Sequence, residues 1–306
     1  MHRLRRFGQP PSRGRLLHEI SPLPLHRCVI PGRMSECATW LNADRVAERV
    51  LGVDFFSGSI AAACHCATAG GLLTAPSGPG LAHDLVREPA YRQALAASDI
   101  VLTDSAFMVL LWRLRSRRRL PRNSGLAFLR VWLNRDVMKR PGAVVWVMPT
   151  EEEFQHTFRW LIRHGYPVKR EEFYVAPSYG PGPISDPGLI ALIENQRPEV
   201  VYLGIGGGVQ ERLGHSLQER LSYRPLILCL GAALAFVTGA QVRIPPWVDR
   251  WGLGWLWRIL SDPRKYFLRY FRATRLAWMI LRFGVEAPPL CRLPRAEPIA
   301  CEPAPE

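Results

Sequence analysis

Short apolar runs alternate with longer amphipathic stretches along the chain, and this alternation predicts strands separated by helices. Runs that are apolar throughout and only a few residues long are typical of strands buried on both faces. Four such runs predict strands at Ile100–Leu102, Val144–Met148, Val200–Leu203 and Leu226–Leu230.

Helical patterns fall between these runs. Thr150 can cap a helix whose third residue is Glu153, the pattern of a capping box, and Gly165 lies where that helix should end. Further helices are predicted at Asp84–Ala97 and Ser185–Asn195. Alternating strands and helices form βαβ units, so we predict an α/β fold with a mostly parallel sheet flanked by helices. Ligands of such sheets bind at the carboxyl ends of the strands.

Composition divides the chain into four parts. Residues 1–45 form a basic, proline-rich leader that we expect to be disordered, and residues 46–240 form the α/β core. Residues 241–285 form a basic, Trp-rich helical appendage, and residues 286–306 form a proline-rich tail, again expected to be disordered.

The longest apolar run, Leu226–Ala240, is too short to cross roughly 30 Å of hydrocarbon. No apolar signal segment follows the basic N-terminus, so we expect a cytoplasmic protein.

The formal net charge of +14 lies at the two ends of the chain. Residues 1–33 carry seven Arg against Glu19, and residues 241–285 carry nine Lys or Arg against two Asp, which leaves a net +1 for all other residues. A nucleic-acid enzyme usually lines its binding channel with Lys and Arg. A nearly neutral middle with basic ends disfavours a nucleic-acid partner and favours attachment to an anionic membrane surface.

The seven Cys are too sparse for a disulfide scaffold, and no pair of Cys-x-x-Cys motifs is present. We therefore expect no structural zinc site. Cys64-His65-Cys66 is interpreted as part of a buried strand or helix in preference to a ligand set.

The segment Gly204–Glu211 follows a predicted strand and leads into a helix that begins near Gln210. Glycines let backbone N–H groups approach a phosphate, and a helix N-terminus adds positive potential. Val209 stands where the dinucleotide fingerprint needs its last glycine, and no Lys-Ser/Thr pair follows, so neither a dinucleotide site nor a Walker loop is indicated. Phosphate binding and a tight structural turn remain the two interpretations.

Asp104 lies just past a predicted strand, where catalytic carboxylates are commonly displayed, and the alternative is an N-cap of the helix that follows. Thr74 follows the apolar Gly71–Leu73 and could reach the same rim, and its alternative is a turn residue.

The C-terminal segment interleaves aromatic and basic residues. The residues concerned are Trp247, Trp251, Trp255, Trp257 and Trp278, with Arg250, Arg258, Arg264, Lys265, Arg269, Arg272, Arg275 and Arg282. Trp prefers the membrane–water interface, and each basic residue near an anionic leaflet contributes about 1 kcal/mol. A helix pair packed on the core, with a solvated basic face, is the alternative.

Several short motifs follow one another in a fixed order. They are Gly52-Val-Asp-Phe55, Thr74, Asp99–Asp104, Arg122-Asn-Ser-Gly125, Gly204-Ile-Gly206, Gln210-Glu211, Gly231…Phe236…Gly239, Arg243-Ile-Pro245, Gly252-Leu-Gly-Trp255, Arg258, Asp262-Pro-Arg264 and Arg269-Tyr270. In this order, over about residues 46–272, the chain resembles the WecG/TagA/CpsF glycosyltransferases, also called glycosyltransferase family 26.

The resemblance implies a Rossmann-like core and an inverting reaction without metal or other cofactor. Members of the family move a sugar from a UDP-sugar donor to a polyprenyl-diphosphate-linked sugar at the inner face of the cytoplasmic membrane, in surface polysaccharide synthesis. A C-terminal appendage completes the active site and touches the membrane.

The resemblance also implies roles for single residues. Asp104 matches the general base and Thr74 a Thr at the pocket rim, so both are expected to be catalytic, and Arg122 matches a basic residue that could stabilise a diphosphate. Further substrate-binding positions are Gly204, Gly206, Gln210, Glu211, Arg258, Arg264 and Arg269.

The chain departs from the family pattern at several polar positions. Ser105 replaces a Gly, Gly208-Val209 replaces Pro-Lys, Ala235 replaces an Asp, Gly254 replaces a Glu, and Pro76 or Ser77 stands in place of an Asn. These changes predict a different donor sugar or reduced activity. The alternative to an active glycosyltransferase is therefore an impaired member that acts as a non-enzymatic partner in polysaccharide assembly. A nucleotide-dependent oxidoreductase is disfavoured because the glycine fingerprint fails.

Overall fold

The computed structural model of the protein describes residues 47–240, 257, 260 and 274–291. Its centre is a six-stranded sheet in the order β4-β3-β8-β7-β5-β6, and every neighbouring pair is parallel. The strands are β3 (Gly71–Thr74), β4 (Ile100–Val101), β5 (Val144–Met148), β6 (Phe173–Val175), β7 (Val200–Leu203) and β8 (Leu226–Cys229). The predicted α/β class is confirmed.

The four predicted strands are all present. β5 and β7 have the predicted bounds, whereas β4 and β8 each end one residue earlier than predicted. All residues of β3, β4, β5, β7 and β8 are buried, as expected for a parallel sheet covered on both faces.

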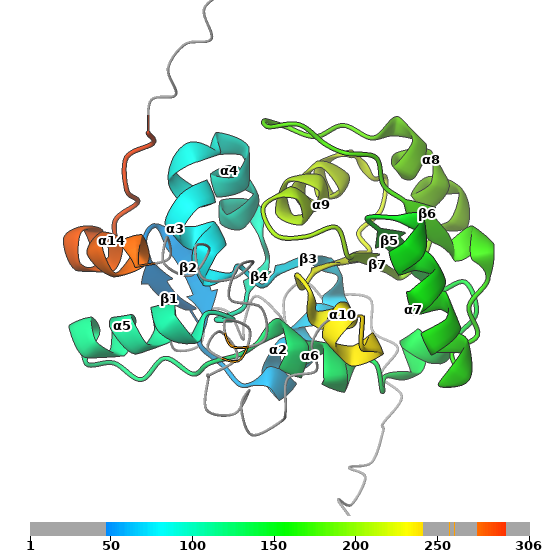
Figure 1. The fold of residues 1–306 in the computed structure, drawn as a ribbon, viewed down its shortest axis with the longest axis horizontal. Helices are drawn as coiled ribbons and strands as arrows, with labels where there is room; N and C mark the ends of the chain where they lie inside the picture. The colour runs from blue at the N-terminus through cyan, green and yellow to red at the C-terminus, as the bar shows by residue number, and fades with distance from the viewer. Residues whose placement is uncertain (1–46, 241–256, 258–259, 261–273, 292–306) are drawn as a thin grey trace, which may run out of the picture.

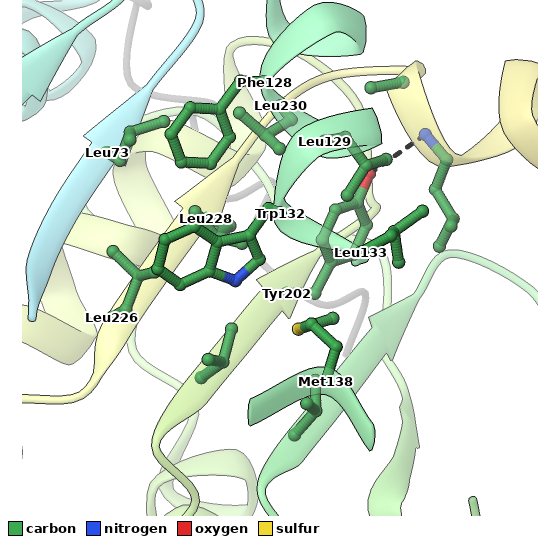
Figure 2. Packing of buried hydrophobic residues seen from close by; sticks show 14 of the residues in the cluster. Leu73, Phe128, Leu129, Trp132, Leu133, Met138, Tyr202, Leu226, Leu228 and Leu230 are labelled. Carbon is green, nitrogen blue, oxygen red and sulfur yellow. Dashed lines mark hydrogen bonds between the residues drawn. The ribbon is translucent and has the colours of Figure 1, made fainter. Parts of the chain in front are cut away.

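Helices cover both faces of the sheet (Figure 1). One face carries α2 (Ile60–Cys66), α6 (Gly125–Trp132), α7 (Glu151–Arg163) and α10 (Ala233–Thr238), and the other carries α8 (Pro187–Gln196) and α9 (Val209–Arg220). Figure 2 shows part of the first core, in which Trp132 lies over Leu226 and Leu228 of β8 and Phe128 lies beside Leu73 of β3. The two cores hold the strands in place, so the strand ends form a rigid edge.

A third cluster lies beside β4, at the left of Figure 1. It unites the antiparallel hairpin β1 (Ala47–Val50) and β2 (Val53–Phe56) with α3 (Gly78–Arg87), α4 (Pro89–Ala97), α5 (Ala106–Ser116) and α14 (Arg275–Phe283). The hairpin turn donates hydrogen bonds from Leu51 and Gly52 to the carbonyls of Gly284 and Val285. The described end of the predicted appendage is thus fastened to the core. Short 3-10 helices occur at η1 (Ala67–Ala69), η2 (Asp136–Lys139) and η3 (Arg170–Glu172).

The prediction of a single helix at Asp84–Ala97 is wrong, because two helices, α3 and α4, meet within this segment. Pro89 has no N–H to continue a helix and disfavours helical backbone in the residue before it. Glu88 is accordingly extended, with φ −118° and ψ 97°.

The other predicted helices form. The Thr150 hydroxyl caps α7 by accepting the Glu153 N–H at 3.2 Å, and Gly165 follows the helix end with φ +78°. α8 starts at Pro187, and its cap is Asp186 where Ser185 was expected to begin the helix. Cys64 is buried in α2, which confirms the interpretation of that motif as part of a buried element.

Within the described segments, every helix is too short or too polar to cross a bilayer. The leader at 1–45, most of the appendage at 241–285 and most of the tail at 286–306 lie outside the described residues.

Gly70, the residue before β3, offers a test of the packing between the starts of β3 and β8. A Cβ on Gly70 would clash with the Arg224 carbonyl oxygen, and Gly70 itself has φ +76°. Gly165 has nearly the same φ, +78°, but open space around it. We expect Gly70→Ala to lower the free energy of unfolding by roughly 2–4 kcal/mol and Gly165→Ala by about 1 kcal/mol, measured by urea denaturation. Equal losses would show that β8 yields to the added methyl.

Candidate active site

The carboxyl ends of the parallel strands bring the predicted site residues to one edge of the sheet. Asp104 follows β4, Thr74 ends β3, the glycine turn at 204–208 follows β7, and Gly231 follows β8. This edge is where α/β sheets bind ligands.

The half-buried Asp104 lies beside the first turn of α6. One of its carboxylate oxygens, Oδ1, accepts the Gly125 N–H at 3.0 Å. The N-cap of α5 is Ser105, whose hydroxyl accepts the Met108 N–H at 3.2 Å, so the N-cap alternative for Asp104 is wrong. A carboxylate at a helix N-terminus is favoured by the partial positive charge there.

Arg122 lies next to the Asp104 backbone. Its Nε donates to the Asp104 carbonyl oxygen at 3.4 Å. The surrounding segment is held by Thr103, whose hydroxyl donates to the Pro121 carbonyl at 2.6 Å and accepts the Asn123 N–H at 2.8 Å. A half-buried cation and a half-buried carboxylate therefore share one corner of the edge.

Thr74 is fully buried, and its hydroxyl donates to the Ser98 hydroxyl at 3.2 Å. Ser98 in turn donates to the Ala94 carbonyl at 2.7 Å. This chain of hydrogen bonds joins β3 to the end of α4 and gives Thr74 a structural role, and its expected place at the pocket rim stays a prediction.

The glycine turn requires glycine at two positions, because Gly206 and Gly208 have φ +93° and +88°. Gly208 could not be the proline of the family pattern, since proline is restricted to negative φ. α9 begins at Val209, one residue before the predicted start. Gly206 is exposed and Gly204 half-buried, which leaves the turn accessible from the edge.

Gln210 and Glu211 are buried beneath this turn. Gln210 Oε1 accepts the Gly231 N–H at 3.1 Å, and Gln210 Nε2 donates to Glu211 Oε1 at 3.1 Å. Glu211 Oε2 accepts the Gly208 N–H at 2.6 Å. The pair thus joins the turns after β7 and β8 and positions the edge, and the expected substrate contact of Gln210 and Glu211 stays a prediction.

A cavity of about 220 Å³ opens where β5, β7 and β8 end. Its described lining includes Gly204, Gly206, Gly231, Glu153, Tyr202 and Ala235. Asp104 is not part of this lining, but it lies near it. Its hydrogen-bond partner Gly125 packs against the Leu230 backbone, because a Cβ built on Gly125 would lie 3.2 Å from the Leu230 carbonyl oxygen. Leu230 directly precedes Gly231, which lines the cavity. The cavity and the Asp104 corner therefore adjoin along the edge.

Sequence patterns missed the polar side chains of this cavity. Glu153 was assigned to helix capping, and Tyr202 appeared only as one residue of an apolar strand. Three other predicted residues, Arg258, Arg264 and Arg269, lie outside the described residues. Among the residues that the structure describes, no group of three or more His, Cys, Asp or Glu is placed to hold a metal ion.

Residues 48–287 match the glycosyl transferase WecG/TagA/CpsF family. The chain belongs to this family. A relative is the N-acetylglucosaminyldiphosphoundecaprenol N-acetyl-β-D-mannosaminyltransferase of Bacillus subtilis (strain 168), 22% identical over 189 residues, or 61% of this chain and 71% of the relative. The predicted resemblance is thus confirmed, and the protein is a glycosyltransferase with a Rossmann-like parallel sheet.

The buried Glu211 of this family member predicts a pH-dependent stability. Burial raises the pKa of its carboxyl from 4.5 to about 7, and the Asp84 carboxylate adds to the effect. The folded state therefore binds the proton more tightly than the unfolded state. The stabilisation is complete below pH 4.5 and is lost as pH rises through 7, by about 3 kcal/mol. Between pH 5 and pH 8 the free energy of unfolding, measured by denaturant titration, should fall clearly less for Glu211→Gln than for the natural protein. Parallel curves would contradict a buried, titrating Glu211.

Proposed function

We propose that the protein transfers a hexose or N-acetylhexosamine from a UDP-sugar to a polyprenyl-diphosphate-linked sugar, with inversion and without a metal, in bacterial surface polysaccharide synthesis. Family membership supports sugar transfer, and the Bacillus subtilis relative is named for a sugar acceptor carried on diphosphoundecaprenol. The observation that carries the proposal is Asp104, a half-buried carboxylate at the ligand-binding edge of the sheet.

Asp104 acts as the general base in this proposal. Its carboxylate takes the proton from the acceptor hydroxyl while that oxygen attacks C1 of the donor sugar from the face opposite the UDP. The bond from C1 to the UDP oxygen breaks as the new glycosidic bond forms, so the configuration at C1 inverts. The hydrogen bond from Gly125 to Oδ1 fixes the orientation of the carboxylate.

The departing UDP needs positive potential close to its diphosphate. The exposed glycine turn at the N-terminus of α9 supplies backbone N–H groups and the helix dipole, although Glu211 already occupies the Gly208 N–H. The Arg122 guanidinium lies at the Asp104 corner and adds a cation. The span from β4 to β5 is four strand spacings, roughly 19 Å, so an extended donor can reach from the cavity to Asp104.

A surface on α5 and α14 supports attachment to the inner face of the membrane. Large apolar side chains are exposed there: Leu110 and Leu114 on α5, and Trp278 and Leu281 on α14. Both helices lie at the same end of the molecule (Figure 1). Exposed Arg115, Arg117, Arg118 and Arg119 follow at the C-terminal end of α5. Apolar residues flanked by arginine suit an anionic leaflet, and α5 begins directly after Asp104, so such docking would bring the lipid-linked acceptor near the base.

The role of Asp104 is tested by Asp104→Asn, which keeps an oxygen for the Gly125 N–H but cannot take a proton. We expect kcat to fall by roughly 10²–10⁴, while UDP affinity changes less than threefold, as measured by UDP release and by calorimetry. Asp54→Asn, on the exposed β1–β2 hairpin, is the matched control and should leave kcat unchanged. Turnover that survives in Asp104→Asn would overturn the base assignment. UDP binding without turnover in the natural protein would favour the impaired partner.

The membrane surface is tested by charge insertion. Leu114 and Trp278 are 71% and 56% exposed, and Ile162 on α7 is 51% exposed at a different site. We expect Leu114→Glu and Trp278→Glu to reduce sedimentation with phosphatidylglycerol-containing vesicles by at least fivefold, because each adds a negative charge and removes apolar area. Ile162→Glu should bind like the natural protein. Equal losses in all three variants would show that binding depends on overall charge and not on this surface.

A further inference from the structure

The cavity at the ends of β5, β7 and β8 contains a carboxylate that the mechanism above does not use. Glu153 lies in the first turn of α7, where its N–H donates to the Thr150 hydroxyl at 3.2 Å. This bond fixes the backbone of Glu153 next to the end of β5. The residue is half-buried, and it lines the cavity together with Tyr202 and the glycines of the turn.

Tyr202 lines the same cavity as this carboxylate. The Tyr202 ring is buried and its oxygen accepts the Leu234 N–H at 3.2 Å, which anchors α10 over the end of β7. Burial raises the pKa of the phenol, and the negative charge of Glu153 is among the further causes. Glu153 and Tyr202 thus border one space, the first with a carboxylate and the second with an aromatic ring.

The wall formed by α10 carries no charge at the position where the family pattern has an Asp. That position is Ala235, which lines the same cavity as Glu153. The cavity of this protein thus has a carboxylate on α7 and a methyl group at position 235. The Glu153 carboxylate on α7 can therefore contact a ligand in this cavity from a different side than position 235 on α10.

The chemistry of the cavity selects one part of a nucleotide sugar. A volume of about 220 Å³ is below the roughly 300–1,000 Å³ typical of sites for whole drug-sized ligands, so the cavity would hold only part of the donor. A carboxylate repels a diphosphate, whereas its two oxygens can each accept a hydrogen bond from a vicinal diol. In nucleotide-binding α/β folds an acidic residue at the sheet edge binds ribose hydroxyls in this way.

We propose that Glu153 accepts hydrogen bonds from the ribose hydroxyls of the donor nucleotide and so determines a preference for ribonucleotides. The inference rests on the proposed function, because it deepens the description of the same donor site. It places the nucleoside in the cavity, the diphosphate at the glycine turn and the transferred sugar toward Asp104, in the order in which these groups occur along the edge of the sheet.

The test combines a change in the protein with a change in the ligand. The dissociation constants of UDP and 2′-deoxy-UDP are measured by calorimetry on the full chain, for the natural protein and for Glu153→Gln and Glu153→Ala. Hydrogen bonds to a charged group predict that the natural protein binds UDP roughly 10- to 100-fold more tightly than 2′-deoxy-UDP. Glu153→Ala should reduce this ratio to below about threefold by weakening UDP alone, and Glu153→Gln should give an intermediate ratio.

Two further variants make the test specific. Glu152→Gln changes an exposed carboxylate in the same turn of α7 and should keep the ratio of the natural protein. Ala235→Asp, added to Glu153→Ala, returns a carboxylate to the cavity and should restore at least part of the ratio. Thermal unfolding of each variant checks that the fold is retained.

The outcomes separate this inference from the proposed function. Equal weakening of both nucleotides in Glu153→Ala, or a natural protein that does not distinguish them, would overturn the ribose contact while leaving sugar transfer by Asp104 intact. Loss of turnover in Asp104→Asn with an unchanged ribose preference would support both proposals. A natural protein that does not bind UDP at all would overturn the inference together with the choice of donor.

Discussion

Parallel pairing of β3, β8, β7 and β5 is the constraint on which the rest of the structure depends. Parallel strands have all their carboxyl ends at one edge, and helices must cover both faces of such a sheet. The loops that leave the strands are therefore the parts of the core that can meet a ligand. Asp104, the glycine turn and Gly231 come from distant parts of the sequence, yet they lie along the same edge of the sheet for this reason.

A buried polar network then stabilises the edge. Gln210 and Glu211 hold the turns after β7 and β8 against each other, and the Glu211 carboxyl remains near its point of titration at neutral pH because burial disfavours its charge. Groups that are costly to bury are retained here where they define the shape of a site.

The carboxylates of the edge divide into separate tasks according to their surroundings. Asp104 has a helix N-terminus and Arg122 beside it, which suits a group that must be ionised to take a proton. Glu211 is enclosed and supports backbone, whereas Glu153 faces a cavity and an aromatic ring. The position of each carboxylate along the edge, more than its residue type, decides whether it can accept a proton, support the backbone or bind a substrate.

Local patterns in the sequence determined the buried strands, the helix ends at Thr150 and Gly165 and the family, since each depends on neighbouring residues or on motif order. Pro89 carried the signal for the break between α3 and α4, which apolar periodicity alone overlooked. Only the tertiary structure decided that Thr74 faces Ser98, that Asp104 meets α6 instead of capping α5, and that Glu153 lines a cavity with Tyr202. These contacts join residues far apart in the chain, and no local pattern specifies which side chains the packed helices will bring together.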